Sequence, residues 1–302
     1  TGNTADDRGG GIYMGQSGTC VVENCEITDN TAARYGGGLY FQPGGMAAGC
    51  LISGNQAVTN GGGGAYLGGG TVMNSLIYGN TANTYGGGLY VVGPTSRVIN
   101  CTISTNRGGL SSGGVELAAT AGQVVNSILY YNYAPTNANL YLISSATSSY
   151  CCVAPSPGGS NFELPPEFED LAGRNFRLKP NSPCIDTGTM THMPETDYEG
   201  RPRPADGDLD GVALPDVGAF EHRFGIRTWM FRGTNSPECE LSYPTRPGKQ
   251  YVVEESATLF PTQNWVFVTT NLSEDFGVVT QAVPQVHPNS SIFRVTVTLT
   301  AP

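Results

Sequence analysis

The chain has 302 residues, of which 42 are glycine, and it carries a net charge of −10 at pH 7. Glycine at about twice its usual share, without a collagen-like period, indicates many tight turns between short strands. The acidic balance argues against a nucleic-acid partner and against docking on anionic lipid, since both need a concentrated basic surface. The sequence also lacks an apolar run of about 18 residues, so no segment is predicted to span a membrane.

A repeat of about 25 residues occupies the first half of the chain. Each copy contains a glycine run, a short apolar strand and a second strand pattern that ends in asparagine. The closing asparagines are Asn30, Asn55, Asn80, Asn106 and Asn132. The strands that follow the glycines are centred on Tyr13, Tyr40, Tyr66, Tyr90, Glu116 and, in a last copy, Tyr141. Because Thr1 falls inside a copy, we expect further sequence upstream.

One copy cannot bury a hydrophobic face by itself, whereas stacked copies bury a continuous core. Backbone hydrogen bonds then join equivalent strands of successive coils, which lie about 4.8 Å apart. A helical solenoid is excluded, because no window has an apolar period of about 3.6 residues and the glycines would break helices. We therefore predict an all-β chain with a right-handed parallel β-helix over residues 1–154.

The alternation of apolar and polar residues predicts which side chains fill this core. Residues equivalent to Leu39 and to Phe41 are apolar in every copy, so both columns should point inward. In the second strand pattern, the columns of Val22 and Ile27 should do the same. The tyrosine column lies between the first two, and we expect it to face water, because its unpaired Glu116 belongs there.

Asparagine marks the bend inside the second strand pattern of most copies. It occurs at Asn24, Asn74, Asn100 and Asn126, and Gly49 takes its place in the remaining copy. Both residue types tolerate left-handed backbone, which a tight bend needs. We expect the amides of these asparagines to bond along the stack.

Cysteine and serine alternate at the next position of the repeat, at Cys25, Cys50, Ser75, Cys101 and Ser127. A position that accepts either residue favours a small, buried side chain. The pattern therefore predicts free thiols in the core in preference to disulfides, and it does not decide the redox compartment.

The repeat is lost after Tyr150. Residues 155–225 are rich in proline, glycine and serine, which predicts an irregular segment that caps the helix. From about Ile226 to residue 302, short β-rich patches alternate with turn residues, and this pattern predicts a small β-sandwich.

Two resemblances follow from these motifs. Gly37-Gly38-Leu39-Tyr40 with Ile52-Ser53-Gly54-Asn55 resembles the repeats of polymorphic outer-membrane proteins, which implies a secreted β-helical surface adhesin. Residues 166–221 resemble the C-terminal portion of bacterial choice-of-anchor Q β-helix proteins. The matching motifs are Pro166-Glu167-Phe168, Asn175-Phe176-Arg177-Leu178, Ser182-Pro183-Cys184-Ile185-Asp186-Thr187-Gly188, Gly200-Arg201-Pro202-Arg203 and Asp216-Val217-Gly218-Ala219-Phe220-Glu221. The second resemblance implies an extracellular or envelope-attached bacterial protein and no particular reaction.

The tyrosine column is the candidate binding site: Tyr13, Tyr40, Tyr66, Tyr90 and Tyr141. Aromatic faces with a hydroxyl group suit stacking on sugar rings or on a protein surface, so a glycan or a cell-surface partner is predicted. The alternative is that the rings stack across coils and only stabilise the solenoid.

Asp206, Asp208 and Asp210 precede Gly211 in the spacing of the first half of a calcium loop. The twelfth position of such a loop is Val217 here and not glutamate, with Asp216 one residue earlier. We predict Ca²⁺ as the only cofactor, held by these four aspartates, with a solvated acidic turn as the alternative.

No catalytic set stands out in the sequence. Acidic residues of the coils share no column, and Arg8 and Arg34, which precede glycine runs, are interpreted as solvated. His192 lies between Asp186 and Asp197, but it is more typical of a surface loop than of a general base. We therefore predict a secreted or cell-surface scaffold that binds a glycan or another surface. A polysaccharide lyase or glycoside hydrolase is the alternative, by analogy with other parallel β-helices.

Overall fold

The computed structural model describes residues 1–15, 20–143 and 145–223, and beyond these the backbone of five further strands. Every regular element in this described part is a β-strand. The chain divides into two compact units, one of Thr1–Ala205 with Ala213–Glu221 and one of Asp206–Val212 with His222–Pro302. The domain boundaries predicted near residues 155 and 226 stay predictions, and Ile226 lies outside the described residues. Nowhere among the described residues is there a helix suited to crossing a bilayer.

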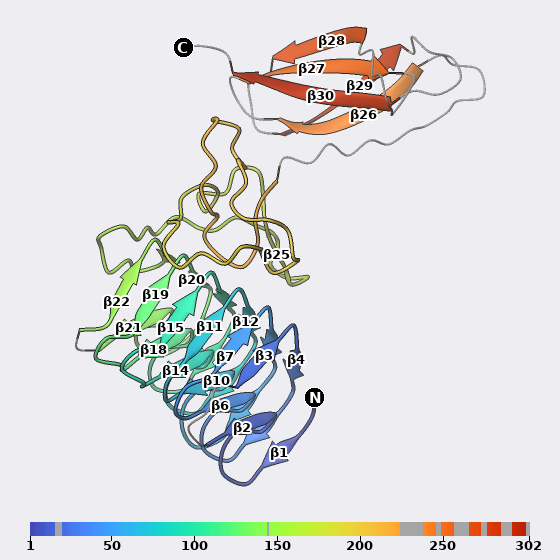
Figure 1. The fold of residues 1–302 in the computed structure, drawn as a ribbon. Helices are drawn as coiled ribbons and strands as arrows, with labels where there is room; N and C mark the ends of the chain where they lie inside the picture. The colour runs from blue at the N-terminus through green and yellow to red at the C-terminus, as the bar shows by residue number, and fades with distance from the viewer. Residues whose placement is uncertain are drawn as a thin grey trace. The chain divides into compact units, whose positions relative to one another are not determined.

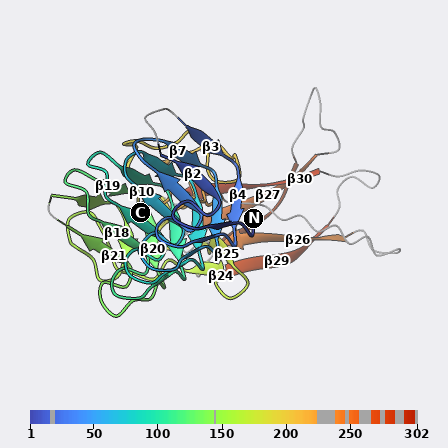
Figure 2. The same cartoon turned by 90° about the horizontal axis from the view of Figure 1, so that it is seen from below.

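Four parallel sheets run through the coils, and successive coils add strands to each of them (Figures 1 and 2). The first joins β1 (Thr4–Ala5), β5 (Thr31–Ala32), β9 (Gln56–Ala57), β13 (Thr81–Ala82) and β17 (Arg107–Gly108). The second, here called the tyrosine sheet, joins β2 (Ile12–Met14), β6 (Leu39–Phe41), β10 (Ala65–Leu67), β14 (Leu89–Val91), β18 (Val115–Leu117) and β21 (Leu140–Leu142).

The other two sheets are formed by the second strand pattern, which the bend at Asn24 and its equivalents divides. One joins β3 (Val21–Glu23), β7 (Met46–Ala48), β11 (Thr71–Met73), β15 (Arg97–Ile99), β19 (Gln123–Val125) and β22 (Thr147–Ser149). The last, here called the cap-facing sheet, joins β4 (Glu26–Thr28), β8 (Leu51–Ser53), β12 (Leu76–Tyr78), β16 (Thr102–Ser104), β20 (Ile128–Tyr130) and β23 (Cys152–Val153). The predicted all-β parallel solenoid is confirmed.

The inward columns also match their prediction. Leu39 pairs with Ala65 and Phe41 with Leu67, so like positions lie directly over one another. These residues, with the columns of Val22 and Ile27, form one continuous buried core. Burying each large aliphatic side chain stabilises the folded state by about 1.5–3 kcal/mol, and this is the main favourable contribution that the repeat makes to folding.

The bend asparagines confirm one expectation fully and another in part. Asn24, Asn74, Asn100 and Asn126 all have a positive φ near 50°, and Gly49 has a φ of 61°. Among them, however, one amide bonds to its neighbour, from Asn126 Nδ2 to Asn100 Oδ1 at 3.4 Å. Asn74 and Asn100 instead donate to the carbonyls of Thr196 and Asp216. The predicted bonding along the stack is thus found between Asn126 and Asn100, whereas the amides of Asn74, Asn100 and Asn126 donate to carbonyls of the segment that follows the coils.

A buried amide ladder exists at the asparagines that close each repeat. The backbone N and Nδ2 of Asn55 both donate to Oδ1 of Asn80, each at 3.0 Å. The same pair of bonds joins Asn30 to Asn55, Asn80 to Asn106, Asn106 to Asn132 and Asn132 to Asn139. Each bond satisfies a polar group that would be costly to leave unpaired in the interior.

The cysteine and serine column is buried at Cys50, Ser75, Cys101 and Ser127 and extends to Cys151. Hydroxyls and backbone amides link its members, as from the N of Cys50 to Oγ of Ser75 at 3.1 Å. Cys50 and Cys101 of this column are buried free thiols, as predicted. Cys25 departs from the prediction, because it is exposed at the first coil.

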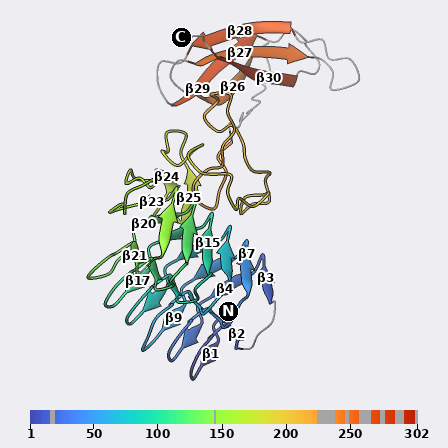
Figure 3. The same ribbon diagram turned by 60° about the vertical axis from the view of Figure 1, so that its left-hand side comes forward.

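The segment after the coils, here called the cap segment (residues 155–205 and 213–221), packs along the outer face of the cap-facing sheet. It includes the antiparallel pair β24 (Phe168–Asp170) and β25 (Asn175–Leu178), which lies beside β20 and β23 in Figure 3. Phe168, Phe176 and Leu178 form a second buried core with Leu76 and Ile128 of that sheet.

A buried ion pair lies within the cap segment. Arg203 Nε is 3.3 Å from Glu221 Oε2, and both side chains are fully buried. The guanidinium also donates to the carbonyls of Asp216, Gly218 and Ala219. The guanidinium of Arg203 thus makes five nitrogen–oxygen contacts, which hold residues 216–221 in the interior of the cap segment.

In the second unit, five strands form two antiparallel sheets, as the patches of sequence predicted. β26 (Glu238–Thr245) pairs with β29 (Gly277–Pro284). β27 (Lys249–Ser256) pairs with both β28 (Val266–Leu272) and β30 (Ile292–Leu299).

Candidate functional site

The predicted tyrosine column lies in register along the tyrosine sheet. Tyr40 pairs with Tyr13 on one side and with Tyr66 on the other, and Tyr66 pairs with Tyr90. Glu116 follows Tyr90, and Tyr141 follows Glu116. Since strand neighbours on one face are about 5 Å apart, equivalent rings are brought into contact.

The rings stack across the coils. Tyr13 and Tyr40 have centroids 5.2 Å apart and planes inclined by 8°, and Tyr40 and Tyr66 are 4.7 Å apart at 9°. Tyr66 and Tyr90 meet edge to face, at 5.7 Å and 73°. Such pairs contribute about 0.5–1.5 kcal/mol each beyond the area they bury, so part of this column stabilises the solenoid.

A second row of side chains covers the column. Arg8 pairs with Tyr35 in the corner that precedes the glycines, so Arg8 and Arg34 do not occupy equivalent positions of the repeat. Arg8 Nη1 donates to Tyr40 Oη at 2.8 Å, and its guanidinium lies 5.2 Å from the ring centroid. Arg8 is therefore only partly solvated, with 31% of its side chain exposed, because it covers the hydroxyl end of a stacked tyrosine. Arg34 is 50% exposed, as expected for a solvated side chain.

Two further tyrosines belong to this outer row. The Tyr35 ring lies 5.1 Å from that of Tyr66, and the Tyr85 ring lies 5.8 Å from that of Tyr90. Gly61 occupies the row between them, where a Cβ would come within 2.8 Å of Tyr90 Cδ1. The absence of a side chain at Gly61 thus leaves room for the ring of Tyr90.

The exposure of the column differs from the prediction. Tyr40 is 1% exposed, because Arg8 and both neighbouring rings cover it. Tyr66 and Tyr90 are half-buried, and burial raises the pKa of Tyr66 to about 12. Only the ends of the column are open to solvent, with Tyr13 57% and Tyr141 39% exposed.

Glu116 also contradicts the expectation of a water-facing position, since it is 4% exposed. Burial raises the pKa of its carboxyl group above the ordinary value, and the nearby serines Ser111 and Ser112 oppose this shift. Its Oε2 is one of the buried oxygens of the described residues that lack a hydrogen-bond partner. Ser111 and Ser112 occupy the positions of Tyr85 and Gly86 in the previous coil, so two hydroxyl groups lie near the one acidic residue of this column.

We name the tyrosine cluster as Tyr13, Tyr35, Tyr40, Tyr66, Tyr85 and Tyr90, with Tyr141 separated from it by Glu116. Tyr35 and Tyr85 were not predicted, because they lie outside the strand pattern. Their position directly before the glycines was the available signal. The accessible rings are Tyr13 and Tyr85, flanked by the half-buried Tyr35, Tyr66 and Tyr90.

The aspartates predicted to bind calcium all accept hydrogen bonds from backbone amides. Asp206, Asp208 and Asp210 lie in one turn, and their carboxylates accept hydrogen bonds from its backbone amides. The N of Asp210 donates to both Asp206 Oδ1 and Asp208 Oδ1. Asp216 is fully buried in the cap segment, and its Oδ1 accepts the N of Asp186 at 2.9 Å. Calcium binding by these residues stays a prediction.

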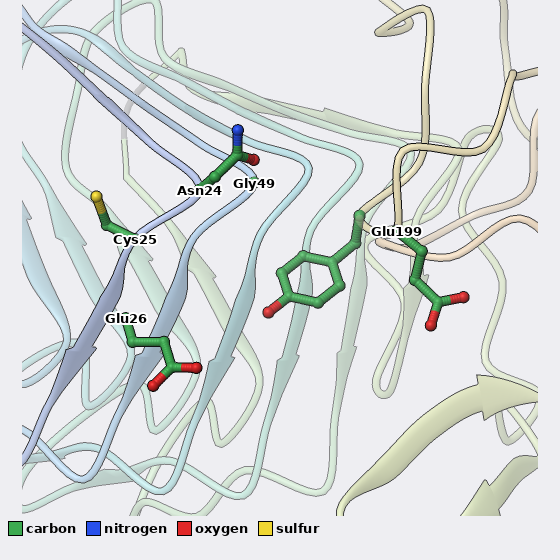
Figure 4. A pocket seen from close by; sticks show the side chains of 6 residues that line it. Asn24, Cys25, Glu26, Gly49 and Glu199 are labelled. Carbon is green, nitrogen blue, oxygen red and sulfur yellow. The ribbon is translucent and has the colours of Figure 1, made fainter.

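A small hollow of about 260 Å³ lies between the first coils and the cap segment (Figure 4). Asn24, Cys25, Glu26 and Gly49 line one side, and Tyr198 and Glu199 line the other. Glu199 contacts Arg177 and Arg201, and it lies 3.0 Å from the latter's Nη1. Sequence reasoning did not find this hollow, because no repeat connects its two sides. His192 is exposed on the same segment, as expected for a loop residue.

Comparison with known proteins gives one match. A family model described as "Right handed beta helix region" matches residues 1–159. No curated protein and no solved structure matches the chain.

Proposed function

The chain belongs to the right-handed β-helix family, and on this premise we propose that it is a non-catalytic bacterial scaffold whose tyrosine cluster binds a glycan or another cell surface. The binding surface consists of the accessible rings Tyr13 and Tyr85 with the edges of Tyr35, Tyr66 and Tyr90. The stacked interior of the cluster holds these rings in fixed positions.

One observation carries this proposal: four tyrosines of the tyrosine sheet and two from the preceding corners, all from neighbouring coils, bring their rings into contact. A rigid aromatic side chain loses little conformational freedom on binding, and its ring face suits the apolar face of a sugar. Arg8 and the tyrosine hydroxyls provide polar groups at the border of this surface.

The proposed location is the bacterial cell envelope or the extracellular space. The resemblance of residues 166–221 to choice-of-anchor Q proteins supports it, as does the resemblance of the coils to polymorphic outer-membrane protein repeats. The sequence holds two lysines, Lys179 and Lys249, and has a net charge of −10, a composition that suits an extracellular β-protein.

The test is a glycan array followed by titration of any glycan that binds. We expect the double variant Tyr13→Ala, Tyr85→Ala to lose about tenfold or more in affinity, because each accessible ring contributes a large contact area. Tyr150→Ala is the matched control, since Tyr150 is as exposed as Tyr85 but lies at the corner between β22 and β23. The stacked Tyr40 is unsuitable for this test, because its removal would leave a cavity.

Two outcomes would contradict the proposal. One is an array without a bound glycan, together with no binding to bacterial or host cell surfaces. The other is a bound glycan whose affinity falls equally in the Tyr150→Ala control and in the double variant.

The alternative is a polysaccharide-active enzyme, and the hollow at Glu26 and Glu199 is the observation that favours it. Glycoside hydrolysis requires two carboxyl groups on either side of a bond. Incubation with acidic and neutral polysaccharides, followed by assays for reducing ends and unsaturated products, tests this alternative. Activity that Glu26→Gln abolishes and Glu23→Gln retains would replace the scaffold proposal.

A further inference from the structure

Two adjacent cysteines at the end of the last coil point to opposite sides of the cap-facing sheet. Cys151 belongs to the core of the coils, whereas Cys152, in β23, belongs to the second core beneath the cap segment. The alternation of a strand places consecutive side chains on opposite faces. Of the two, Cys152 alone therefore faces the cap segment.

A third cysteine meets Cys152 from the cap segment. Cys184 is fully buried in the same core, and its thiol lies within hydrogen-bonding reach of the thiol of Cys152. Cys152 Sγ also contacts the carbonyl of Leu164 at 3.1 Å. The backbone around Cys184 is held on both sides, because its N donates to Ser182 Oγ and its carbonyl accepts a hydrogen bond from the N of Val217.

We propose that Cys152 and Cys184 are an oxidisable pair, and that they form a disulfide linking β23 to the cap segment. With a small-molecule disulfide as the oxidant, both thiols lose their protons and together give up two electrons. One sulfur–sulfur bond forms between the cysteines, the bond of the oxidant breaks, and two small thiols are released.

Burial determines when this reaction occurs. The thiolate is the nucleophile in thiol–disulfide exchange, and burial raises the pKa of Cys184 well above its ordinary value. The folded protein therefore reacts slowly, and the disulfide forms while the cap segment folds onto the coils. Once formed, it is shielded from reductant by the same core. This oxidation does not require the tyrosine cluster to bind a glycan.

The experiment refolds the full chain with oxidised and reduced glutathione, blocks the remaining thiols by alkylation and maps the peptides by mass spectrometry. We expect a peptide pair joined through Cys152 and Cys184, with fragmentation to distinguish Cys152 from Cys151. The disulfide would close a loop of about 30 residues, which should raise Tm by about 5–10 °C over the reduced protein.

Cys151→Ser is the matched control for Cys152→Ser. Serine already occupies the column of Cys151 at Ser75 and Ser127, so this variant should keep both the linked peptide and the oxidation-dependent rise in Tm. Cys152→Ser and Cys184→Ser should lose both, and each variant is compared with its own reduced form so that a packing defect cancels.

Three results would overturn the proposal. They are alkylation of both cysteines after oxidative refolding, a linkage of either one to a different cysteine, and loss of the linked peptide in Cys151→Ser with its retention in Cys152→Ser.

Discussion

The coils and the cap segment satisfy their buried polar groups in different ways. In the coils, one arrangement is repeated: Asn55 bonds to Asn80 as Asn80 bonds to Asn106. In the cap segment the contacts occur once, and Arg203 alone donates to three carbonyls while it pairs with Glu221. A repeated contact leaves a periodic trace in the sequence, and a unique contact does not.

This difference also affects how a mutation is tolerated. A coil has neighbours of the same kind on both sides, so a defect in one coil leaves most of the ladder intact. A residue such as Arg203 has no equivalent elsewhere. We therefore expect single substitutions in the cap segment to have the larger effects on its stability.

The largest effect is expected for Arg203→Met, which should lower the free energy of unfolding by about 3–5 kcal/mol. The change removes the cation that pairs with Glu221 and one donor to each of three buried carbonyls. The Glu221 carboxyl then keeps its hydrogen bonds from the backbone amides of Ala205 and Asp216. Burial raises the pKa of Glu221 to about 7, so part of the cost is relieved by protonation of this acid. Urea denaturation measures the change, and Arg201→Met, at an exposed arginine, is the control. Equal losses in the two variants would contradict a special role for the buried pair.

A smaller loss of about 2–3 kcal/mol is expected for Asn80→Ala in the coils. The variant removes the acceptor of Asn55 and the donor to Asn106, but the ladder continues on either side of the gap. The same urea experiment measures this loss. Asn83→Ala, at an exposed asparagine of the same coil, should change stability by less than about 0.5 kcal/mol. A loss at Asn80 as large as that at Arg203 would remove the distinction between repeated and unique contacts.

The same distinction explains what the sequence could predict. The inward columns of Leu39 and Phe41 and the left-handed bends at Asn24 and its equivalents follow from alternation and from residue type, and the structure confirms them. The burial of Tyr40 and Glu116 was missed, because Arg8 and Ser111, which cover them, belong to a different part of the repeat.

Contacts of the cap segment left no periodic signal at all. The amide of Asn74 meets Thr196 across more than a hundred residues, and the thiol of Cys152 meets that of Cys184. Neither partner recurs in the sequence, so only the folded chain brings them together. The register of the tyrosine column could be predicted, but not the outer row of Tyr35 and Tyr85 that decides which rings remain accessible.

A third prediction concerns alkaline pH and the tyrosine cluster. The pKa of Tyr66 is raised to about 12 by burial, whereas an unfolded tyrosine titrates near pH 10. Below pH 10 both states keep the proton; above it the unfolded state loses the proton first, so stability falls as the pH rises toward 12. Because Tyr66 is only partly buried, we expect its share to be about 1–2 kcal/mol by pH 11.5.

Denaturant unfolding at pH 9, 10, 11 and 11.5 tests this expectation. Tyr66→Phe has no phenol to ionise, so its stability should fall less steeply with pH than that of the unmodified chain. Tyr141→Phe is the control variant, because it removes the hydroxyl of an exposed tyrosine on the same sheet. Parallel curves for Tyr66→Phe and the unmodified chain would show that the stacked ring does not resist ionisation.

The smallest effect, less than about 1 kcal/mol, is expected for Cys101→Ser in the reduced protein. Ser75 and Ser127 show that a hydroxyl fits this column, where each donates to a backbone carbonyl as the Cys101 thiol does. Cys184→Ser places a hydroxyl in the second core, where Cys184 has no equivalent position in a repeat that is occupied by serine. This variant should therefore lower the free energy of unfolding by about 1–2 kcal/mol. Urea denaturation under reducing conditions compares the two variants. Equal losses of stability in the two variants would mean that any buried cysteine of this protein can be replaced by serine at the same cost. The repeated column of the coils would then accept serine no better than the second core does.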